Sequence, residues 1–170
     1  NMAPHNLTEC CDAICAYIDN PEITVEELMQ YVKGPDFPTG GIIQGRQGIK
    51  DAFETGRGRI VIRSKTEIEV SDSGRETIVV TEIPYMVNKR EMIEKIAEMV
   101  ESKKIEGIAY INDETTMKGV RIVIRLKKDA NSNVVLNTLF KYTPLQSSFS
   151  VNNVALVNGL PRTLNLKDLI

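Results

Sequence analysis

The residues most able to do chemistry in this sequence are basic side chains that gather within twenty positions. This cluster consists of Arg46, Lys50, Arg57, Arg59, Arg63 and Lys65. Gly56 and Gly58 flank its first central arginine, and glycines let the backbone approach another group closely. Guanidinium and ammonium groups neutralise phosphates, and each phosphate neutralised on duplex DNA steepens the salt dependence of binding by about 0.9 in the log–log slope. The cluster therefore predicts a surface that binds a polyanion.

Alternation along the chain predicts the strand that positions these cations. Between residues 59 and 70, one side receives Ile60, Ile62, Ser64, Thr66, Ile68 and Val70, and the other receives Arg59, Val61, Arg63, Lys65, Glu67 and Glu69. Period-two alternation is typical of a half-buried strand with one face in water. A second basic strand follows, where Arg121, Val123, Arg125 and Lys127 alternate with apolar residues. For either strand, an ordinary charged solvent face is the alternative.

Met2 is a separate candidate for contact with DNA. It lies two residues before Pro4, and no periodic pattern assigns it to a core. An apolar side chain held beside a rigid turn can insert between base steps, at an unstacking cost of roughly a few kcal/mol that the bent DNA repays. A frayed terminal residue is the alternative interpretation.

The sequence contains few residue patterns that are typical of catalytic sites. His5 is the only histidine, so the chain cannot assemble an internal Ser-His-Asp or Cys-His arrangement. The Gly56-x-Gly58 pair lacks the third glycine of a dinucleotide loop, and Gly45 to Gly48 lacks the Gly-Lys-Ser/Thr of a P-loop. The acidic residues are scattered. We therefore expect no catalytic residue, no bound cofactor and no metal in this chain.

The three cysteines and the charge distribution place further bounds. Cys10, Cys11 and Cys15 lie on one predicted helix without a second cluster, which predicts small buried thiols in a reducing cytoplasm. The net charge is −2. The charges are segregated, however: residues 40–65 and 119–170 are basic, and the other two blocks are acidic. No apolar run is long enough to span a membrane.

Capping residues and hydrophobic spacing predict the remaining elements. We expect helices from Leu7 to about Ile18, from Thr24, from Ile49 to Phe53, from Lys89 to Lys104 and from Asn131 to Tyr142. The first helix is expected to bury Leu7, Cys11, Ile14, Cys15 and Ile18, and the last Val134, Val135, Leu139 and Phe140. Strands are expected over 59–70, 76–83, 108–112, 120–127, 149–157 and 162–164, and a helix is expected to begin after Leu164.

This order predicts an α+β fold. Residues 76–157 follow a split β-α-β-β-α-β order, so we expect a mixed or antiparallel sheet with helices on one face, extended by strand 59–70. The Gly34–Gly41 segment breaks regular structure. We therefore expect a helical lead-in over residues 1–39 and an α+β domain over residues 40–170.

Several segments resemble one known family. Asn1 to Glu9, Gly34 to Thr39, Thr55 to Gly58, Glu82 to Tyr85, Val87 to Lys89 and Asn165 to Asp168 are similar, in order, to the A subunits of bacterial DNA gyrase, a type IIA topoisomerase. The resemblance runs the full length. It implies the tower region of the breakage-reunion core, cut from a longer protein, with the lead-in that follows the winged-helix domain.

The resemblance also implies partners and roles. The family cuts both strands of double-stranded DNA through a tyrosine that follows an arginine, and no tyrosine here does so; that nucleophile is expected before Asn1. Magnesium and ATP are implied for the gyrase B subunit, and the gyrase A polypeptide is implied to form a homodimer in the whole enzyme. Met2 stands where the family places an intercalating apolar residue, and Ala3 departs from the frequent proline there. The basic residues around Arg57 resemble the surface that supports the DNA.

Three alternatives stay open. The topoisomerase IV A subunit shares these motifs. A stand-alone split-βαβ module that binds single-stranded RNA is the second, but such modules display aromatic side chains for base stacking, and only 5% of this chain is aromatic. A purely structural or dimerising role is the third.

Overall fold

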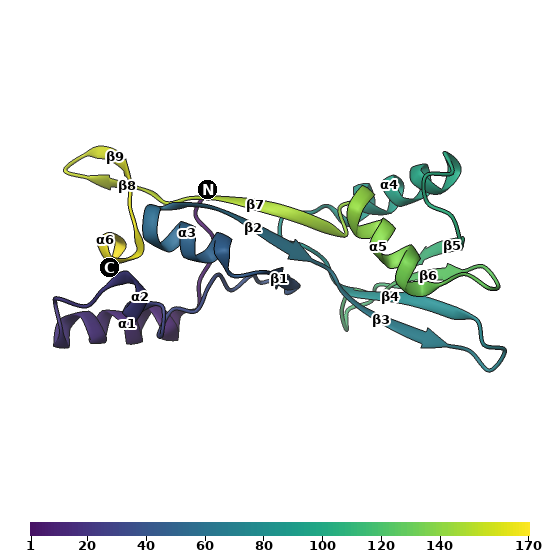
Figure 1. Cartoon of the computed structure of the whole chain (residues 1–170), viewed down its shortest axis with the longest axis horizontal. Coiled ribbons are helices and arrows are strands. Elements are labelled where there is room, and N and C mark those ends of the chain that lie inside the picture. Colours follow the sequence, from purple (N-terminus) through teal and green to yellow (C-terminus); the bar gives the residue numbers. More distant parts are fainter. The chain divides into compact units, whose positions relative to one another are not determined.

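Capping residues and glycines divide the chain into six helices and nine strands. The computed structural model describes every residue from Asn1 to Ile170 (Figure 1). The helices are α1 (Leu7–Asp19), α2 (Val25–Leu28), α3 (Gln47–Thr55), α4 (Lys89–Glu101), α5 (Ser132–Tyr142) and α6 (Leu166–Leu169). The strands are β1 (Ile42–Gln44), β2 (Arg57–Arg63), β3 (Lys65–Val70), β4 (Glu76–Glu82), β5 (Ile108–Asp113), β6 (Ile122–Leu126), β7 (Gln146–Asn152), β8 (Val154–Val157) and β9 (Leu160–Thr163).

The strands form three antiparallel sheets, so the predicted α+β fold is confirmed. Their orders are β1-β2-β7, β3-β4-β6-β5 and β8-β9. The chain also divides into two compact units. Unit 1 holds residues 1–38, 43–61 and 148–170, and unit 2 holds residues 39–42 and 62–147. This division follows a different line from the domain boundary expected after residue 39, which stays a prediction.

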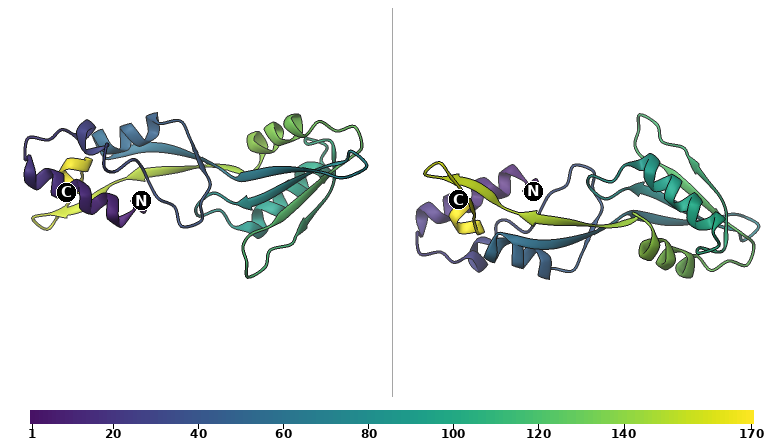
Figure 2. Two further views of the ribbon diagram at one scale, coloured as in Figure 1. Left: turned by 90° about the horizontal axis from the view of Figure 1, so that it is seen from below. Right: turned by 90° about the horizontal axis from the view of Figure 1, so that it is seen from above.

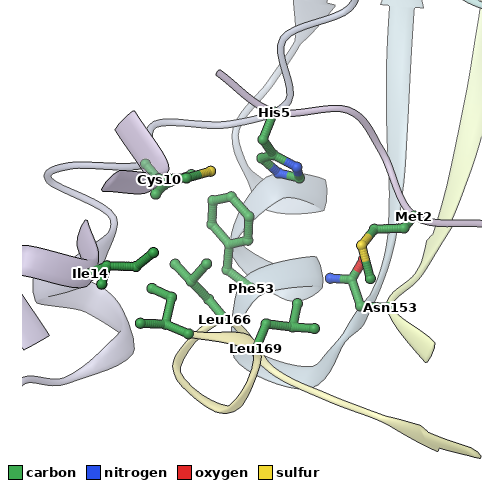
Figure 3. Close-up of a pocket in the computed structure, with 10 residues that line it drawn as sticks. Met2, His5, Cys10, Ile14, Phe53, Asn153, Leu166 and Leu169 are labelled. Atoms are coloured by element: carbon green, nitrogen blue, oxygen red, sulfur yellow. The ribbon is translucent and has the colours of Figure 1, made fainter. Parts of the chain in front are cut away.

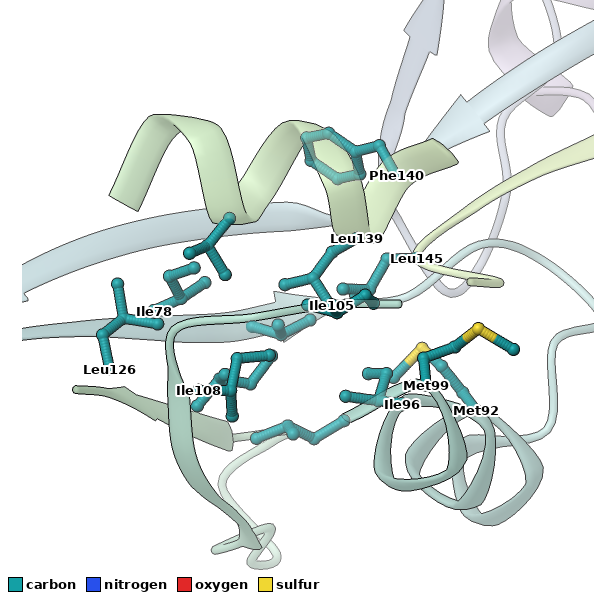
Figure 4. Close-up of a cluster of buried hydrophobic side chains, with 14 of the residues drawn as sticks. Ile78, Met92, Ile96, Met99, Ile105, Ile108, Leu126, Leu139, Phe140 and Leu145 are labelled. Carbon is teal, nitrogen blue, oxygen red and sulfur yellow. The ribbon is translucent and has the colours of Figure 1, made fainter. Parts of the chain in front are cut away.

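Helices α4 and α5 cover one face of the four-stranded sheet in unit 2 (Figure 2). Alternate residues of β4 and β6, such as Ile78 and Ile124, point to this face and are fully buried. They pack against Met92 and Ile96 of α4 and Leu139 of α5 in one cluster (Figure 4). Each fully buried aliphatic side chain of this size contributes about 1.5–3 kcal/mol, so this cluster is the main source of stability in unit 2.

The strand order differs from a complete split β-α-β-β-α-β sheet. The elements from β4 to β7 follow that order along the chain, but β7 pairs with β2 in another sheet. Strand β3 instead lies beside β4, to which it is joined by a turn at Ser71–Gly74. Consecutive strands joined by a short turn pair more readily than strands separated by a helix, so β3 takes the edge position.

Two expected long strands are each interrupted at a buried polar residue. The strand expected over 59–70 is two strands, β2 and β3, which belong to different sheets and are separated by Ser64. The strand expected over 149–157 is also two, β7 and β8, separated by Asn153. Ser64 and Asn153 are almost completely buried, and their backbone amides donate to Leu145 and Gly56 outside the regular ladders. Alternation alone did not reveal these breaks.

Three of the predicted helix starts are confirmed by their caps, whereas the helix expected from Ile49 begins at Gln47. Asn6 Oδ1 accepts from the amide of Glu9 at 3.1 Å, and Thr24 Oγ1 accepts from Glu27 at 3.2 Å. Asn88 caps α4, where the Glu91 amide is 3.1 Å from its side-chain oxygen. Each such bond satisfies a backbone donor that the helix itself leaves unpaired.

The expected burial of one face of α1 is wrong. Only Ala13 of this helix is buried; Leu7 is 77% exposed and Ile18 is 69% exposed. Cys11 and Cys15 are exposed and Cys10 is partly buried, so the cysteines are not core thiols. Val134 of α5 is likewise 61% exposed rather than buried. Helical spacing shows which residues share a face, but it does not show whether another element covers that face.

Glycines bring helix α3 against strand β2 in unit 1. A Cβ atom at Gly58 would overlap the carbonyl oxygen of Gly48 and lie 2.8 Å from the amide nitrogen of Ala52. A Cβ atom at Gly48 would overlap the carbonyl oxygen of Arg59. The helix ends at Gly56, whose φ of 82° is a left-handed conformation that glycine adopts at little cost. The glycines therefore permit backbone to pack on backbone, without side chains between.

None of the helices is both long enough and apolar enough to cross a membrane.

The α3–β2 contact leads to a stability prediction. We expect Gly58→Ala to lower the free energy of unfolding by about 1–3 kcal/mol, because the new methyl group overlaps backbone that cannot move independently. Gly34→Ala is the matched control, since its methyl group would meet only the flexible side chain of Ile49. Chemical denaturation of both variants measures the difference, and equal losses would contradict the steric account.

Candidate nucleic-acid interface

Arg57 and Arg59 form an exposed basic pair on β2 in unit 1. Alternation along the strand places them on the face opposite Gly58 and Ile60, which α3 covers. Thr55 Oγ1 holds the start of the strand, since it accepts from the Arg57 amide at 3.2 Å and donates to the Asp51 carbonyl of α3 at 2.7 Å. Neither guanidinium group forms an ion pair. Both charges are therefore available to an external anion.

Arg46, the residue just before α3, and Lys50, within it, lie away from the Arg57–Arg59 pair. They line an open groove of about 510 Å³ together with Lys33 and Glu26. Lys50 also lies 3.8 Å from Glu54, in an exposed pair that adds little stability. Helix α3 covers one face of β2, and Arg57 and Arg59 extend from the other face. The basic residues of α3 and those of β2 are close in sequence, but they therefore present their charges on different sides of the contact between α3 and β2.

Met2 is held in place, although it lies next to the first residue. The Asn152 amide donates to the Asn1 carbonyl at 2.8 Å, and the Asp36 amide donates to the Pro4 carbonyl at 2.8 Å. Ala3, between these anchors, is 4% exposed, whereas Met2 is 49% exposed. A fixed backbone thus presents a half-exposed apolar side chain.

Arg63 is engaged inside unit 2. Its Nε and Nη2 atoms donate to Gln146 Oε1 at 3.0 and 2.8 Å. Its guanidinium carbon also lies 4.3 Å from the ring centroid of Phe140, a distance that allows a cation–π interaction. These contacts fix the side chain and assign it a packing role. No local pattern could have indicated them, because Gln146 is 83 residues away.

The other three basic candidates of unit 2 differ in whether they form ion pairs within the chain. Arg121 Nη2 lies 3.4 Å from Glu69 Oε2, and its Nε lies 3.2 Å from Glu114 Oε2. Both carboxylates raise the pKa of the guanidinium group, and the hydrogen bond to Glu114 has the largest effect. Lys65 is exposed at the start of β3, and Arg125 is partly exposed on β6, and neither forms an ion pair. In unit 2, Lys65 and Arg125 are therefore the available predicted cations.

A further ion pair lies near the end of β5. Lys89 Nζ is 2.9 Å from Asp113 Oδ2, and this bond, with a second from Thr115, lowers the pKa of Asp113 to about 2. The pair joins the start of α4 to the end of β5.

Sequence reasoning missed two buried polar groups in unit 1. The Nε2 atom of His5 and the Oδ1 atom of Asn153 are buried without a hydrogen-bond partner. Burial lowers the pKa of His5, against opposing effects of the Ala3 carbonyl, Glu9 and Asp36. The His5 ring also lies 5.7 Å from the ring of Phe53. A histidine and an asparagine at opposite ends of the sequence give no local signal that would have paired them.

The described residues contain no group of three or more His, Cys, Asp or Glu side chains that could hold a metal ion.

The buried histidine leads to a pH prediction. Because the folded state lowers the pKa of His5, the unfolded chain binds that proton more strongly, so stability should fall as the pH drops below about 6.5. A proton NMR titration of the single histidine should give a pKa below 6.5 in the folded chain. His5→Gln should remove this part of the pH dependence between pH 7.5 and 5.5; a folded-state pKa at or above 6.5 would contradict the burial.

The Arg63 contacts predict a structural defect rather than a binding defect. Arg63→Lys keeps the charge but loses the two bonds to Gln146 and the stacking on Phe140, so we expect unfolding to become easier by about 1–2 kcal/mol. Arg59→Lys is the matched control on the same strand and should change stability little. Thermal denaturation compares them, and a neutral Arg63→Lys would show that the contacts are unimportant.

Comparison with known proteins agrees with the resemblance. A family model that describes the A subunit of DNA gyrase/topoisomerase IV matches residues 1–170. The DNA gyrase A subunit of Ureaplasma parvum serovar 3 is 59% identical over 170 residues, and that of Clostridium acetobutylicum is 55% identical over 170 residues. Both alignments cover 100% of this chain and 20% of the relative, so the chain spans about a fifth of their length.

The match over the whole length is decisive, and the chain belongs to the family of DNA gyrase/topoisomerase IV A subunits.

Proposed function

We propose that this chain supports double-stranded DNA without cutting it, as the tower part of a gyrase A subunit. In the whole enzyme, the A subunits would form a homodimer, work with the gyrase B subunit, and break and rejoin both DNA strands to supercoil DNA with ATP. The family match and the relatives' names support this proposal. The chemistry of strand cutting would come from outside these 170 residues, since no tyrosine here follows an arginine.

One structural observation carries the DNA-supporting role: the exposed and unpaired Arg57–Arg59 pair on β2. Residues i and i+2 of a strand lie about 6.6–6.8 Å apart, close to the spacing of successive phosphates along one DNA strand. The pair is held by the α3–β2 contact, so its spacing is fixed before DNA arrives. Lys65 and Arg125 are additional phosphate contacts in this proposal, whereas Arg46 lies away from the Arg57–Arg59 pair and is not counted among them.

Met2 completes the proposal as an apolar wedge. Its anchored backbone and half-exposed side chain suit insertion between base steps, and the energy of unstacking would be repaid by contacts of bent DNA with basic residues. Arg63 and Arg121 are not needed as contacts, because each is already committed to neighbours in unit 2.

Recognition of single-stranded RNA is less well supported. The face of the four-stranded sheet opposite α4 and α5 carries Tyr110 as its one aromatic residue. Base-stacking platforms use two or three aromatic side chains on that face. Arg125, opposite Tyr110 in the register, offers a charge but not a second ring.

Salt-dependent DNA binding tests the proposal. The variant Arg57→Glu/Arg59→Glu should bind a 30-base-pair duplex more weakly, and its log–log salt slope should become shallower by about 1–2, the value for one or two lost phosphate contacts. Fluorescence anisotropy between 25 and 200 mM salt measures both quantities. Lys103→Glu/Lys104→Glu is the matched control: it makes the same change of net charge at two exposed lysines that follow α4. Equal losses in the two variants would mean that only net charge matters.

A further inference from the structure

Unit 1 contains a pocket that the DNA-supporting role does not use. It has a volume of about 280 Å³. Segments far apart in the sequence form it: Met2 and His5 from the N-terminal segment, Cys10 from α1, Phe53 from α3, and Leu169 from α6 (Figure 3). The lining is mostly apolar and contains no charged side chain. The pocket therefore disfavours a charged ligand, which would lose its hydration there without a partner.

The two unpaired polar atoms described above belong to residues that line this pocket. His5 Nδ1 is 2.8 Å from the Ala3 carbonyl oxygen, and a carbonyl can only accept, so Nδ1 carries the hydrogen. In the neutral ring, Nε2 is then an acceptor without a donor. Asn153 is 1% exposed, its backbone amide and carbonyl are bonded to Gly56 and Leu164, and its Oδ1 atom is a second unpaired acceptor.

Buried acceptors without a donor are rare, and they cost stability unless another molecule satisfies them. Phe53, whose ring is tilted by 36° to the His5 ring, adds an aromatic wall. Small-molecule sites are typically concave and mainly apolar, with a few convergent polar groups. A pocket of about 280 Å³ lies just below the usual size range of such sites, about 300–1,000 Å³.

We propose that this pocket binds a small, uncharged, flat apolar molecule that donates an N–H hydrogen bond to His5 Nε2 or Asn153 Oδ1. The aromatic and aliphatic walls bury the body of the ligand, and the acceptors fix its orientation. Because Met2 is part of the lining, a bound molecule would also contact the proposed wedge. That consequence depends on the proposed function, whereas the binding itself does not.

Indole and 1-methylindole are matched probes for this pocket, since they differ mainly in the N–H donor. With the 170-residue chain, we expect indole to shift the NMR signals of the single histidine in a saturable way. We expect 1-methylindole to bind at least about tenfold more weakly, the loss that follows when one buried hydrogen bond is not made. Indole should also protect Cys10 from alkylation, as measured by mass spectrometry, while Cys11 and Cys15 on the same helix serve as internal controls. This experiment uses no DNA, so its outcome is independent of the DNA-supporting role.

Variants on α1 locate the binding. Cys10→Met narrows the pocket and should weaken indole binding at least about fivefold, because added methylenes fill space that the ligand needs. Cys11→Met, at an exposed neighbour, should leave the binding unchanged. Equal affinity for the two indoles would overturn the proposal, because the acceptors would then play no part. The absence of saturable indole binding would also overturn it, because the pocket would then hold water alone. Equal losses of indole affinity in Cys10→Met and Cys11→Met would do the same, because indole would then bind elsewhere on the surface.

Discussion

The direct contact between the backbones of α3 and β2 is the constraint on which unit 1 depends. Gly48 and Gly58 lie where any side chain would overlap the opposing main chain, so the helix approaches the strand more closely than side chains would allow. Gly56 ends the helix in a left-handed conformation and turns the chain directly into β2. Its own missing Cβ atom leaves room for the carbonyl of Leu164, which precedes α6. The three glycines therefore fix the positions of two helices and a strand.

Both surfaces of interest follow from this constraint. On the helix side, the contact fixes Phe53, a wall of the pocket that also contains His5 and Asn153. On the opposite side, β2 presents Arg57 and Arg59 at a fixed interval. A basic residue on a loop would have to lose conformational freedom when it met a phosphate, whereas a side chain on a packed strand has a backbone that is already ordered. Gly48, Gly56 and Gly58 in this stretch serve packing.

Much of the fold could be predicted from the sequence because its signals are local. Asn6, Asn88 and Asn131 each cap the helix predicted to follow them, and the apolar spacing of α5 correctly identifies Leu139 and Phe140 as core residues. The long strands could not be divided correctly, because Ser64 fits the alternation but its backbone bonds to Leu145, far away in sequence. The exposed face of α1 shows the same limit, since Leu7 and Ile18 have core-like spacing without a covering element.

The candidate site divides in the same way. The sequence identifies the cations, but only three-dimensional contacts separate the unpaired Arg57 and Arg59 from Arg63, which is committed to Gln146 and Phe140. The pocket was not predictable, because His5 and Asn153 become neighbours through the packing of segments from both ends of the chain. Family resemblance led to the proposed DNA-supporting role, and the contacts distinguish basic residues that are unpaired from those that already have partners.

Native-state hydrogen exchange tests the glycine constraint most directly. If the α3–β2 contact holds the two elements as one cooperative unit, the amides of Phe53 in α3 and Ile60 in β2 should open with the same free energy. In Gly58→Ala, both should then exchange faster by the same factor. Faster exchange of Phe53 alone, or unchanged exchange at both amides, would contradict the claim that direct backbone packing organises this unit.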